Sequence, residues 1–123
     1  VKIHQTTCQF TKDLNELVYG IWVAHAEGKF VIDGDTLKEL KLNNQIVMTY
    51  VDNNMNTTQK YPHNPNGSVN GIAAISSKNG RHLAMMPHPE RSFMKWQIPW
   101  MPDNINNLIS DYTPWFKMFN LEL

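Results

Sequence analysis

The sequence predicts part of an α/β domain that is rich in strands and carries only short helices. An Asn-Gly dipeptide at 79–80 stands between two apolar runs, which is the strongest short-range sign of a β-hairpin. The run IVMTYV at 46–51 has the length and β-branching of a buried strand, and leucines with helical spacing occur at 36–44. Strands and helices do not alternate regularly, so we expect a portion of a larger architecture rather than a complete domain.

The first quarter of the chain is expected to contain strands and one helical turn. Residues 1–10 are typical of a strand, and 11–20 suit a short helical turn. Residues 21–32 are rich in β-branched and aromatic side chains on both sides of Glu27-Gly28, which predicts strand, turn, strand. The chain starts on Val1 in an extended run already under way, so we expect further sequence upstream.

The central part predicts one helix and three strands. A helix is expected to open at Gly34 and to end at the Asn pair 43–44, followed by the strand at 46–51. Residues 52–68 are dense in Asn, Pro and Gly and should form turns. The hairpin strands are expected within 69–77 and 81–87.

The C-terminal part contains a Pro/Trp-rich connection at 96–104 and then a segment, 107–123, that we expect to end as a short helix on aromatic anchors. We expect its large aromatic side chains to lie in a core or an interface, because no basic groove accompanies them as in a stacking platform for bases. These residues are Trp96, Trp100, Trp115, Phe116 and Phe119.

Composition excludes several classes of function. The chain has 123 residues, enough for one small domain, and 41% of them are hydrophobic, enough for a core. Its formal net charge is zero with no block of like charge, which argues against nucleic-acid or membrane-surface binding. A single cysteine, Cys8, excludes an internal disulfide framework and a thiolate zinc cluster. No apolar stretch reaches the roughly 18 residues of a membrane span, so we expect a cytoplasmic protein.

The tripeptide His88-Pro89-Glu90 pairs a potential base with a carboxylate. Proline fixes its own φ and pushes the preceding residue into extended geometry, so we expect an extended segment here. Residues two apart in such a segment point to the same side, which lets His88 and Glu90 face one site. A carboxylate bound to one imidazole nitrogen leaves the other free as a general base. The pair is two-thirds of a catalytic triad without its nucleophile.

Simpler interpretations of these residues stay open. His88 can end a strand beside an exposed carboxylate, because short motifs match often by accident. Cys8 is not expected to be the missing nucleophile, because a tight strand-to-helix elbow needs glycines and TTCQF has none. We expect Cys8 to be a buried structural thiol.

A second His/Glu pair occurs at His25-Ala26-Glu27. Zinc deaminases carry a similar pair but also need a later pair of cysteines, which this chain lacks. A metal site made of histidines and carboxylates stays conceivable, although no spacing typical of a metal-binding helix supports it. Its members would be His25, Glu27, His63, His88 and Glu90.

The stretch YPHNPNGS at 61–68 offers amides, hydroxyls and a tight turn at Gly67. Such a loop suits contact with a polar substrate or another domain, because binding residues are often presented on loops. The simpler alternative is that Asn, Pro and Gly form turns and nothing more.

Four stretches, in order, resemble one enzyme family. WVAHAEGKF, YVDNNMNTTQKYPHNPNGS, GIAAISSKNGRHLAMMPHPERSF and TPWFKMF are similar to the closing portion of the phosphoribosylformylglycinamidine synthases of purine biosynthesis. The similarity runs from about Ile21 to Phe119, and residues 1–20 match loosely. YPHNPNGS and MMPHPER in this order are far more specific than either alone.

The resemblance implies that residues 1–123 are the later half of a class I glutamine amidotransferase domain, which is flavodoxin-like. In that family a Cys-His-Glu triad hydrolyses glutamine, and the ammonia passes to a synthetase domain that uses ATP and Mg²⁺ to form formylglycinamidine ribonucleotide. His88 and Glu90 align with the triad histidine and glutamate. The resemblance also implies a site-shaping role for four residues: His25, Asn66, Gly67 and Ser68. It implies no cofactor in this segment.

The family's nucleophile lies in a glycine-flanked cysteine motif upstream of everything in this chain. We therefore expect His88 and Glu90 to serve a cysteine that lies elsewhere, with the remainder of the enzyme as partner. The segment by itself is expected to be inactive. The alternative function is a non-catalytic, amidotransferase-like interaction module.

Overall fold

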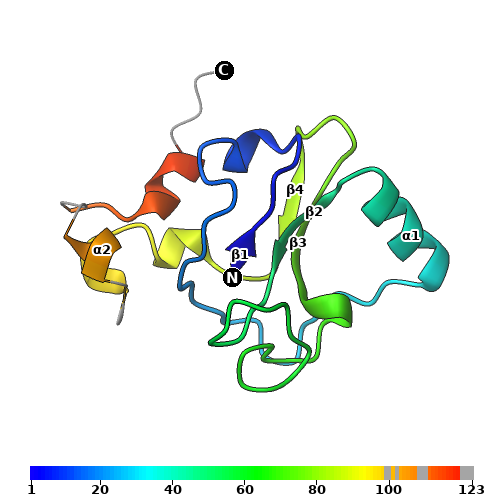
Figure 1. Ribbon diagram of the computed structural model, residues 1–123, viewed down its shortest axis with the longest axis horizontal. Helices are drawn as coiled ribbons and strands as arrows, with labels where there is room; N and C mark the ends of the chain where they lie inside the picture. The colour runs from blue at the N-terminus through cyan, green and yellow to red at the C-terminus, as the bar shows by residue number, and fades with distance from the viewer. Residues whose placement is uncertain (99–100, 102, 108–110, 120–123) are drawn as a thin grey trace.

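A four-stranded antiparallel sheet organises the chain, with strand order β1-β2-β3-β4 (Figure 1). The computed structural model describes residues 1–98, 101, 103–107 and 111–119. The strands are β1 (Lys2–Ile3), β2 (Ile46–Thr49), β3 (Ile72–Ser76) and β4 (Leu83–Met85). The α-helices are α1 (Gly34–Leu42) and α2 (Asp103–Asn106), and 3₁₀ turns occur at Gln9–Thr11, Val69–Gly71, Pro89–Arg91, Lys95–Gln97 and Pro114–Met118.

The strand pairing brings two chain segments to one end of the sheet. Thr49 at the end of β2 pairs with Ile72 at the start of β3, and Ala74 pairs with Met85 at the end of β4. Because all neighbours are antiparallel, the loop at 50–71 and the segment after Met85 leave from the same end. We call this end the site end; it lies at the bottom of Figure 1, opposite the β3–β4 turn.

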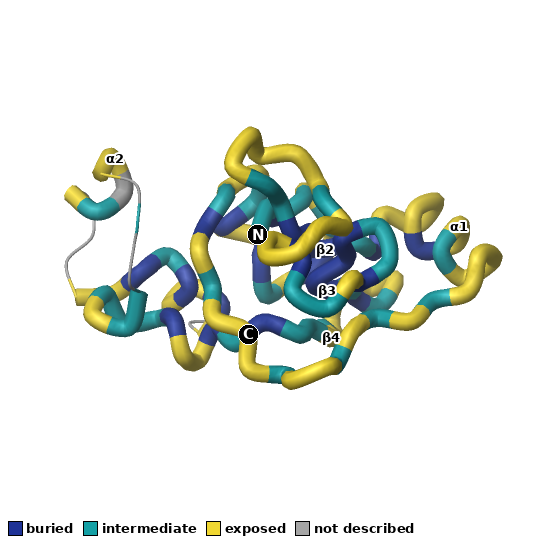
Figure 2. The backbone as a smooth tube through the Cα atoms, turned by 90° about the horizontal axis from the view of Figure 1, so that it is seen from below, coloured by how far each residue is buried: buried dark blue, intermediate teal, exposed yellow. Residues whose placement is uncertain are grey.

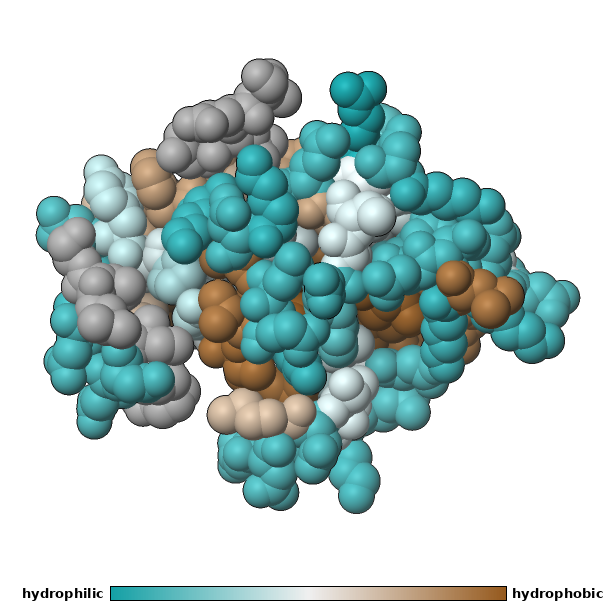
Figure 3. Space-filling view, turned by 45° about the horizontal axis from the view of Figure 1, so that its top comes forward, coloured by the Kyte–Doolittle hydropathy of each residue, from teal (hydrophilic) through white to brown (hydrophobic). Residues whose placement is uncertain are grey.

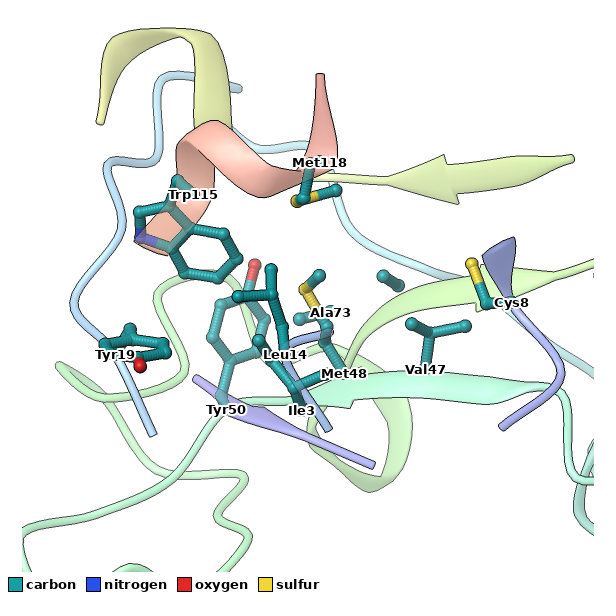
Figure 4. Packing of buried hydrophobic residues seen from close by; sticks show 11 residues of the cluster. Ile3, Cys8, Leu14, Tyr19, Val47, Met48, Tyr50, Ala73, Trp115 and Met118 are labelled. Carbon is teal, nitrogen blue, oxygen red and sulfur yellow. The ribbon is translucent and has the colours of Figure 1, made fainter. Parts of the chain in front are cut away.

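The core lies mainly between the sheet and two other parts of the chain, the N-terminal segment and the C-terminal aromatic segment (Figures 2 and 4). Trp115 packs edge-on against Tyr19, with ring centroids 5.9 Å apart, and its indole Nε1 donates to the carbonyl of Gly20 at 2.8 Å. The C-terminal aromatic segment is thereby anchored on the N-terminal one. Other buried members of this cluster are Ile3, Cys8, Leu14, Val47, Met48, Tyr50, Ala73, Ala74 and Met118. Brown apolar residues show through between polar ones in the middle of Figure 3.

Helix α1 confirms the predicted helix, and its first turn is capped by a side chain. Asp33 Oδ1 accepts hydrogen bonds from the backbone N–H groups of Asp35 at 3.0 Å and Thr36 at 2.9 Å. These two N–H groups would otherwise have no partner, because the first turn of a helix has no preceding carbonyls. The hydrogen bonds from Thr36 lead the causes that lower the pKa of Asp33.

The predicted hairpin is also confirmed. β3 and β4 are joined by a turn in which Gly80 N–H donates to the carbonyl of Ser77 at 2.9 Å. Gly80 has φ +70°, a conformation that glycine adopts without a steric penalty. Its own carbonyl accepts from the N–H of Gln9 at 3.0 Å, which ties the turn to the N-terminal segment.

The expectations for residues 1–32 are wrong in part. β1 is only two residues long, and 11–20 form turns instead of a helix. The reason is that β1 takes the backbone groups of this segment, since Ile3 N–H donates to Leu17 and Glu16 N–H donates to Ile3, both at 2.9 Å. Within 21–32, Trp22 makes an isolated bridge to His88, and no strand forms because no neighbouring strand pairs with the rest.

The C-terminal expectations are partly confirmed. The short helix appears as the 3₁₀ turn Pro114–Met118, with Trp115 buried as expected. Phe116, Phe119 and especially Trp96 are exposed, so they do not lie in the core, and an interface stays a prediction for them. Trp100 and residues 108–110 and 120–123 lie outside the described part of the chain, so the prediction for them stays a prediction.

Replacing Gly80 by alanine should destabilise the protein. An ideal Cβ at Gly80 would lie 1.9 Å from the carbonyl oxygen of Thr7, and the positive φ adds strain of about 1–2 kcal/mol for an L-residue. We expect a loss of more than about 2 kcal/mol in the free energy of unfolding, measured by chemical denaturation. Gly34→Ala is the matched control, because no atom lies within 4 Å of its ideal Cβ. Equal stability of the two variants would show that a Cβ atom is tolerated at position 80.

Candidate functional site

The side chains of His88 and Glu90 form a hydrogen-bonded pair at the site end. His88 Nδ1 and Glu90 Oε1 are 2.5 Å apart, with the two side chains 29% and 54% exposed. A carboxylate can only accept, so the proton of this contact belongs to Nδ1 in the ionised pair. The other imidazole nitrogen, Nε2, is then the one that can take up or release a proton.

The backbone that presents this pair differs from the expectation. The prediction of an extended tripeptide is wrong. Only the His88 backbone dihedrals lie toward the extended region (φ −113°, ψ 89°), and Pro89–Arg91 forms a 3₁₀ turn. Proline is tolerated in the first turn of a helix, where its missing N–H is not needed. The turn closes with Arg91 N–H donating to the carbonyl of His88 at 3.1 Å. It folds the chain back so that Glu90 reaches the His88 ring without the alternation of a strand.

Ser92 locks this turn to two other segments. Its Oγ donates to the carbonyl of His88 at 3.2 Å and accepts from the N–H of Trp22, also at 3.2 Å. The His88 N–H donates to the carbonyl of Trp22 at 2.8 Å, and Thr113 Oγ1 donates to the carbonyl of Ser92 at 2.6 Å. Ser92 is fully buried. Sequence reasoning missed Ser92, because its partners are 21 and 70 residues away.

The surroundings of Glu90 favour its charged form. Partial burial raises the pKa of Glu90, but the hydrogen bond from His88 and the charges of His88 and Arg91 outweigh it, so the net pKa is lowered. Arg91 has only a weak effect on the pKa of Glu90, because its Nε lies 4.0 Å from Glu90 Oε1 and its side chain is exposed. Glu90 therefore stays a carboxylate over the range in which an imidazole titrates.

The Asn66 side chain holds the turn at 25–28. Its Nδ2 lies 2.5 Å from the carbonyl oxygen of Ala26, 2.8 Å from that of Gly28 and 3.0 Å from His25 Nδ1. An amide nitrogen can only donate, and its two hydrogens are shared among these three acceptors; when one points to His25, Nδ1 accepts it and the proton of a neutral His25 lies on Nε2. That Nε2 is buried and has no hydrogen-bond partner among the described residues.

This turn packs beside the strand that leads to His88. An ideal Cβ at Gly28 would lie 2.8 Å from Met86 Cε, two residues before His88. Residues 22–28 thus run from the His88 backbone contact to the loop that carries Asn66. Among the described residues, no hydrogen bond joins His25 directly to the His88–Glu90 pair.

The other two residues of the predicted site-shaping set differ in role. Ser68 is buried, and its Oγ donates to the carbonyl of Ile72 at 2.6 Å, so it holds the loop at 57–68 to the sheet. Gly67 has φ +70° and nothing within 4 Å of its ideal Cβ. Sequence reasoning missed Asn64, which is buried and bonds both the N–H and the carbonyl of Ser68 at 3.0 Å.

The structure does not support two alternative centres. No group of three or more His, Cys, Asp or Glu side chains is close enough to hold a metal ion within the described ranges. Cys8 is buried as expected, and its backbone lies beside the Gly80 turn, because an ideal Cβ at Gly80 would be 3.1 Å from Cys8 N. That turn is at the end of β4 opposite His88, so Cys8 cannot reach the His88 ring.

Residues 1–122 match the family model described as a CobB/CobQ-like glutamine amidotransferase domain. The chain belongs to this family. The match confirms the predicted class, an α/β glutamine amidotransferase domain. Among the described residues, no helix has the length and apolar character needed to cross a membrane.

Curated relatives confirm the resemblance to phosphoribosylformylglycinamidine synthases. The chain is 42% identical over 123 residues to that synthase of Dictyostelium discoideum, covering 97% of the chain and 9% of the relative. It is 41% identical over 120 residues to the probable chloroplastic/mitochondrial synthase of Arabidopsis thaliana, covering 97% and 8%. It is 46% identical over 100 residues to the synthase subunit PurQ of Methanococcus maripaludis strain C7, covering 80% and 36%. The chain thus spans about a tenth of the long relatives and a third of the PurQ subunit.

The titration of Glu90 should report the pair directly. Its lowered pKa means that the carboxylate stays charged until the pH falls through that value, so the contact with His88 is complete above it and lost below it. We expect the midpoint of the Glu90 side-chain ¹³C signal to lie below that of an ordinary glutamate, and to rise in His88→Ala. A midpoint that does not move in the variant would show that His88 does not hold the carboxylate.

Proposed function

We propose that this chain supplies the general base of the glutaminase site of a phosphoribosylformylglycinamidine synthase. The enzyme would hydrolyse glutamine and deliver the ammonia for the ATP-dependent conversion of formylglycinamide ribonucleotide to formylglycinamidine ribonucleotide. The observation that carries the proposal is the 2.5 Å contact between His88 Nδ1 and Glu90 Oε1 in a glutamine amidotransferase chain. The similarity to phosphoribosylformylglycinamidine synthases and to their PurQ subunit supports the choice of synthase.

The first chemical step needs a thiol from outside residues 1–123. His88 Nε2 accepts its proton, which leaves a thiolate next to a protonated imidazole. The thiolate attacks the side-chain carbonyl carbon of glutamine, and a C–S bond forms. His88 then returns the proton to the departing nitrogen as the C–N bond breaks, which releases ammonia and leaves a glutamyl thioester.

The same histidine completes the second half of the reaction. It accepts a proton from a water molecule that attacks the thioester carbonyl, and the proton then returns to the sulfur as glutamate leaves. Glu90 keeps Nδ1 occupied through both halves, so the ring orientation is constant and the positive charge on the imidazole is stabilised. The lowered pKa of Glu90 supports this role, because a neutral acid would stabilise that charge far less.

The partners follow from the proposed reaction. They are glutamine, the remainder of the amidotransferase domain with the nucleophilic cysteine, and a synthetase part that would hold ATP and Mg²⁺. We place the enzyme in the cytoplasm. A non-catalytic interaction module stays the alternative, but no observation on the described residues favours it.

The assignment of His88 is tested in the complete enzyme. His88→Ala should lower glutamine-driven turnover by about 10²–10⁴-fold, because general-base catalysis has this magnitude, and should leave turnover with added ammonia near its original rate. Steady-state assays with each nitrogen source separate the two effects.

His82→Ala is the control, since His82 is exposed near the opposite end of β4 and should retain both activities. If His88→Ala used glutamine as fast as the parent enzyme, the proposed role would be wrong.

We also propose that Asn66 shapes the site by holding the turn at 25–28. Asn66→Asp replaces a donor by an acceptor that faces two carbonyl oxygens. We expect a loss of about 1 kcal/mol in stability, the size of a lost hydrogen bond, together with slower glutamine-driven turnover. Denaturation and kinetic assays would measure both.

Asn53→Asp makes the same chemical change on an exposed turn where the Asn side chain makes no hydrogen bond among the described residues. This control should leave stability and turnover unchanged. Equal behaviour of the two variants would refute the role of Asn66.

A further inference from the structure

The loop at 57–68 has a fixed base. Asn64 is buried, and its Nδ2 donates to the carbonyls of Thr58 at 3.2 Å and Ser68 at 3.0 Å, while its Oδ1 accepts from the Ser68 N–H at 3.0 Å. The backbone N–H of Thr58 donates to the carbonyl of Tyr50 at the end of β2, also at 3.0 Å. The two legs of the loop are therefore joined to each other and to the sheet. A loop held in this way loses little conformational entropy when its tip binds something.

The tip of this loop, residues 59–63, is exposed throughout. Tyr61 is 81% exposed, and its ring contacts no other aromatic ring among the described residues. Tyrosine is enriched at binding hot spots, because it offers a large apolar ring and a polar hydroxyl at low entropic cost. An ordered loop that presents an unpacked tyrosine has the form of a binding element rather than a simple connection.

The charge of the loop selects the kind of surface that it fits. Residues 57–68 include Lys60 and His63 and no Asp or Glu. Lys60 makes no ion pair within the described part of the chain. The acidic side chain in the preceding turn, Asp52, is engaged locally, since its Oδ1 accepts from the N–H groups of Asn54 and Asn56. A surface with carboxylates around an apolar depression would complement Tyr61 and Lys60 together.

The loop lies at the site end of the sheet, together with the His88–Glu90 pair. It is part of the segment at 50–71, which joins the end of β2 to the start of β3, and His88 follows the end of β4 at the same end (Figure 1). Asn66 bonds the loop to the turn at 25–28, and Trp22 bonds that segment to His88. A protein segment that brings a thiol to His88 must approach this end of the sheet, where the loop tip also lies.

We propose that residues 59–63 are a docking element for the part of the enzyme outside residues 1–123, with Tyr61 in an apolar depression of that part and Lys60 facing a carboxylate on it. The inference rests on the proposed function for the occupant, because the long relatives contain about ten times the length of this chain. It adds a contact surface that the catalytic pair itself does not require.

Photocross-linking in the full-length enzyme tests the docking element. Tyr61→p-benzoylphenylalanine should cross-link on irradiation to one segment outside residues 1–123, identified by mass spectrometry of the digest. Leu42→p-benzoylphenylalanine is the matched control, because Leu42 is 86% exposed but lies at the C-terminal end of α1, just before the start of β2 and away from the site end. We expect at least a tenfold lower yield of the same product from position 42. Products confined to 52–68, or equal yields from both positions, would overturn the proposal.

The charge of the partner surface is tested by a second substitution in the enzyme that carries p-benzoylphenylalanine at position 61. Lys60→Glu should lower the yield from position 61 several-fold, whereas Lys60→Arg should keep it, because a reversed charge would meet carboxylates. An unchanged yield with Lys60→Glu would overturn the acidic character of the surface. Cross-linking needs no turnover, so the His88→Ala enzyme should give the same product. A failure of the glutaminase assignment can thus be distinguished from a failure of the docking element.

Discussion

The backbone hydrogen bond from His88 to Trp22 connects the candidate site to the rest of the molecule. It supplements the attachment of the turn at 89–91 through β4, which is only three residues long. Ser92 reinforces the contact, since one hydroxyl group serves both the Trp22 N–H and the His88 carbonyl. The backbone of His88 is therefore held by the backbone of Trp22 and by the buried Ser92, and this would keep the direction of the imidazole constant in the proposed role as a general base.

This arrangement explains how the proposed half of a catalytic site can be ordered by residues 1–123 themselves. Every hydrogen bond that orients His88 comes from the chain itself: Glu90 holds the ring, and Trp22 and Ser92 hold the backbone. The thiol in the chain is at the other end of the hairpin, packed in the core beside the Gly80 turn. In the proposed mechanism, base and nucleophile are thus separable parts, and the base would be preorganised before a thiol approaches it.

The loop at 57–68 and the turn at 25–28 extend the site along the same end of the sheet. Asn66 joins them through two backbone carbonyls, so the position of one depends on the other. Polar side chains rather than apolar packing hold this region, as Asn64 and Ser68 also show. Such contacts are directional, so they specify one loop conformation in a part of the protein with little buried apolar surface.

Local chemistry by itself determined the parts of this protein whose partners are near in sequence. The helix at 34–42 follows from its Asp33 cap and leucine spacing, the hairpin follows from Asn79-Gly80, and the pairing of His88 with Glu90 follows from their separation by one proline. Tertiary structure decided the rest. Residues 11–20 have helical signals but give their backbone groups to β1, and the tripeptide expected to be extended became a 3₁₀ turn. The roles of Ser92 and Asn66 depend on contacts 21 to 70 residues away, and no periodicity or spacing records such contacts.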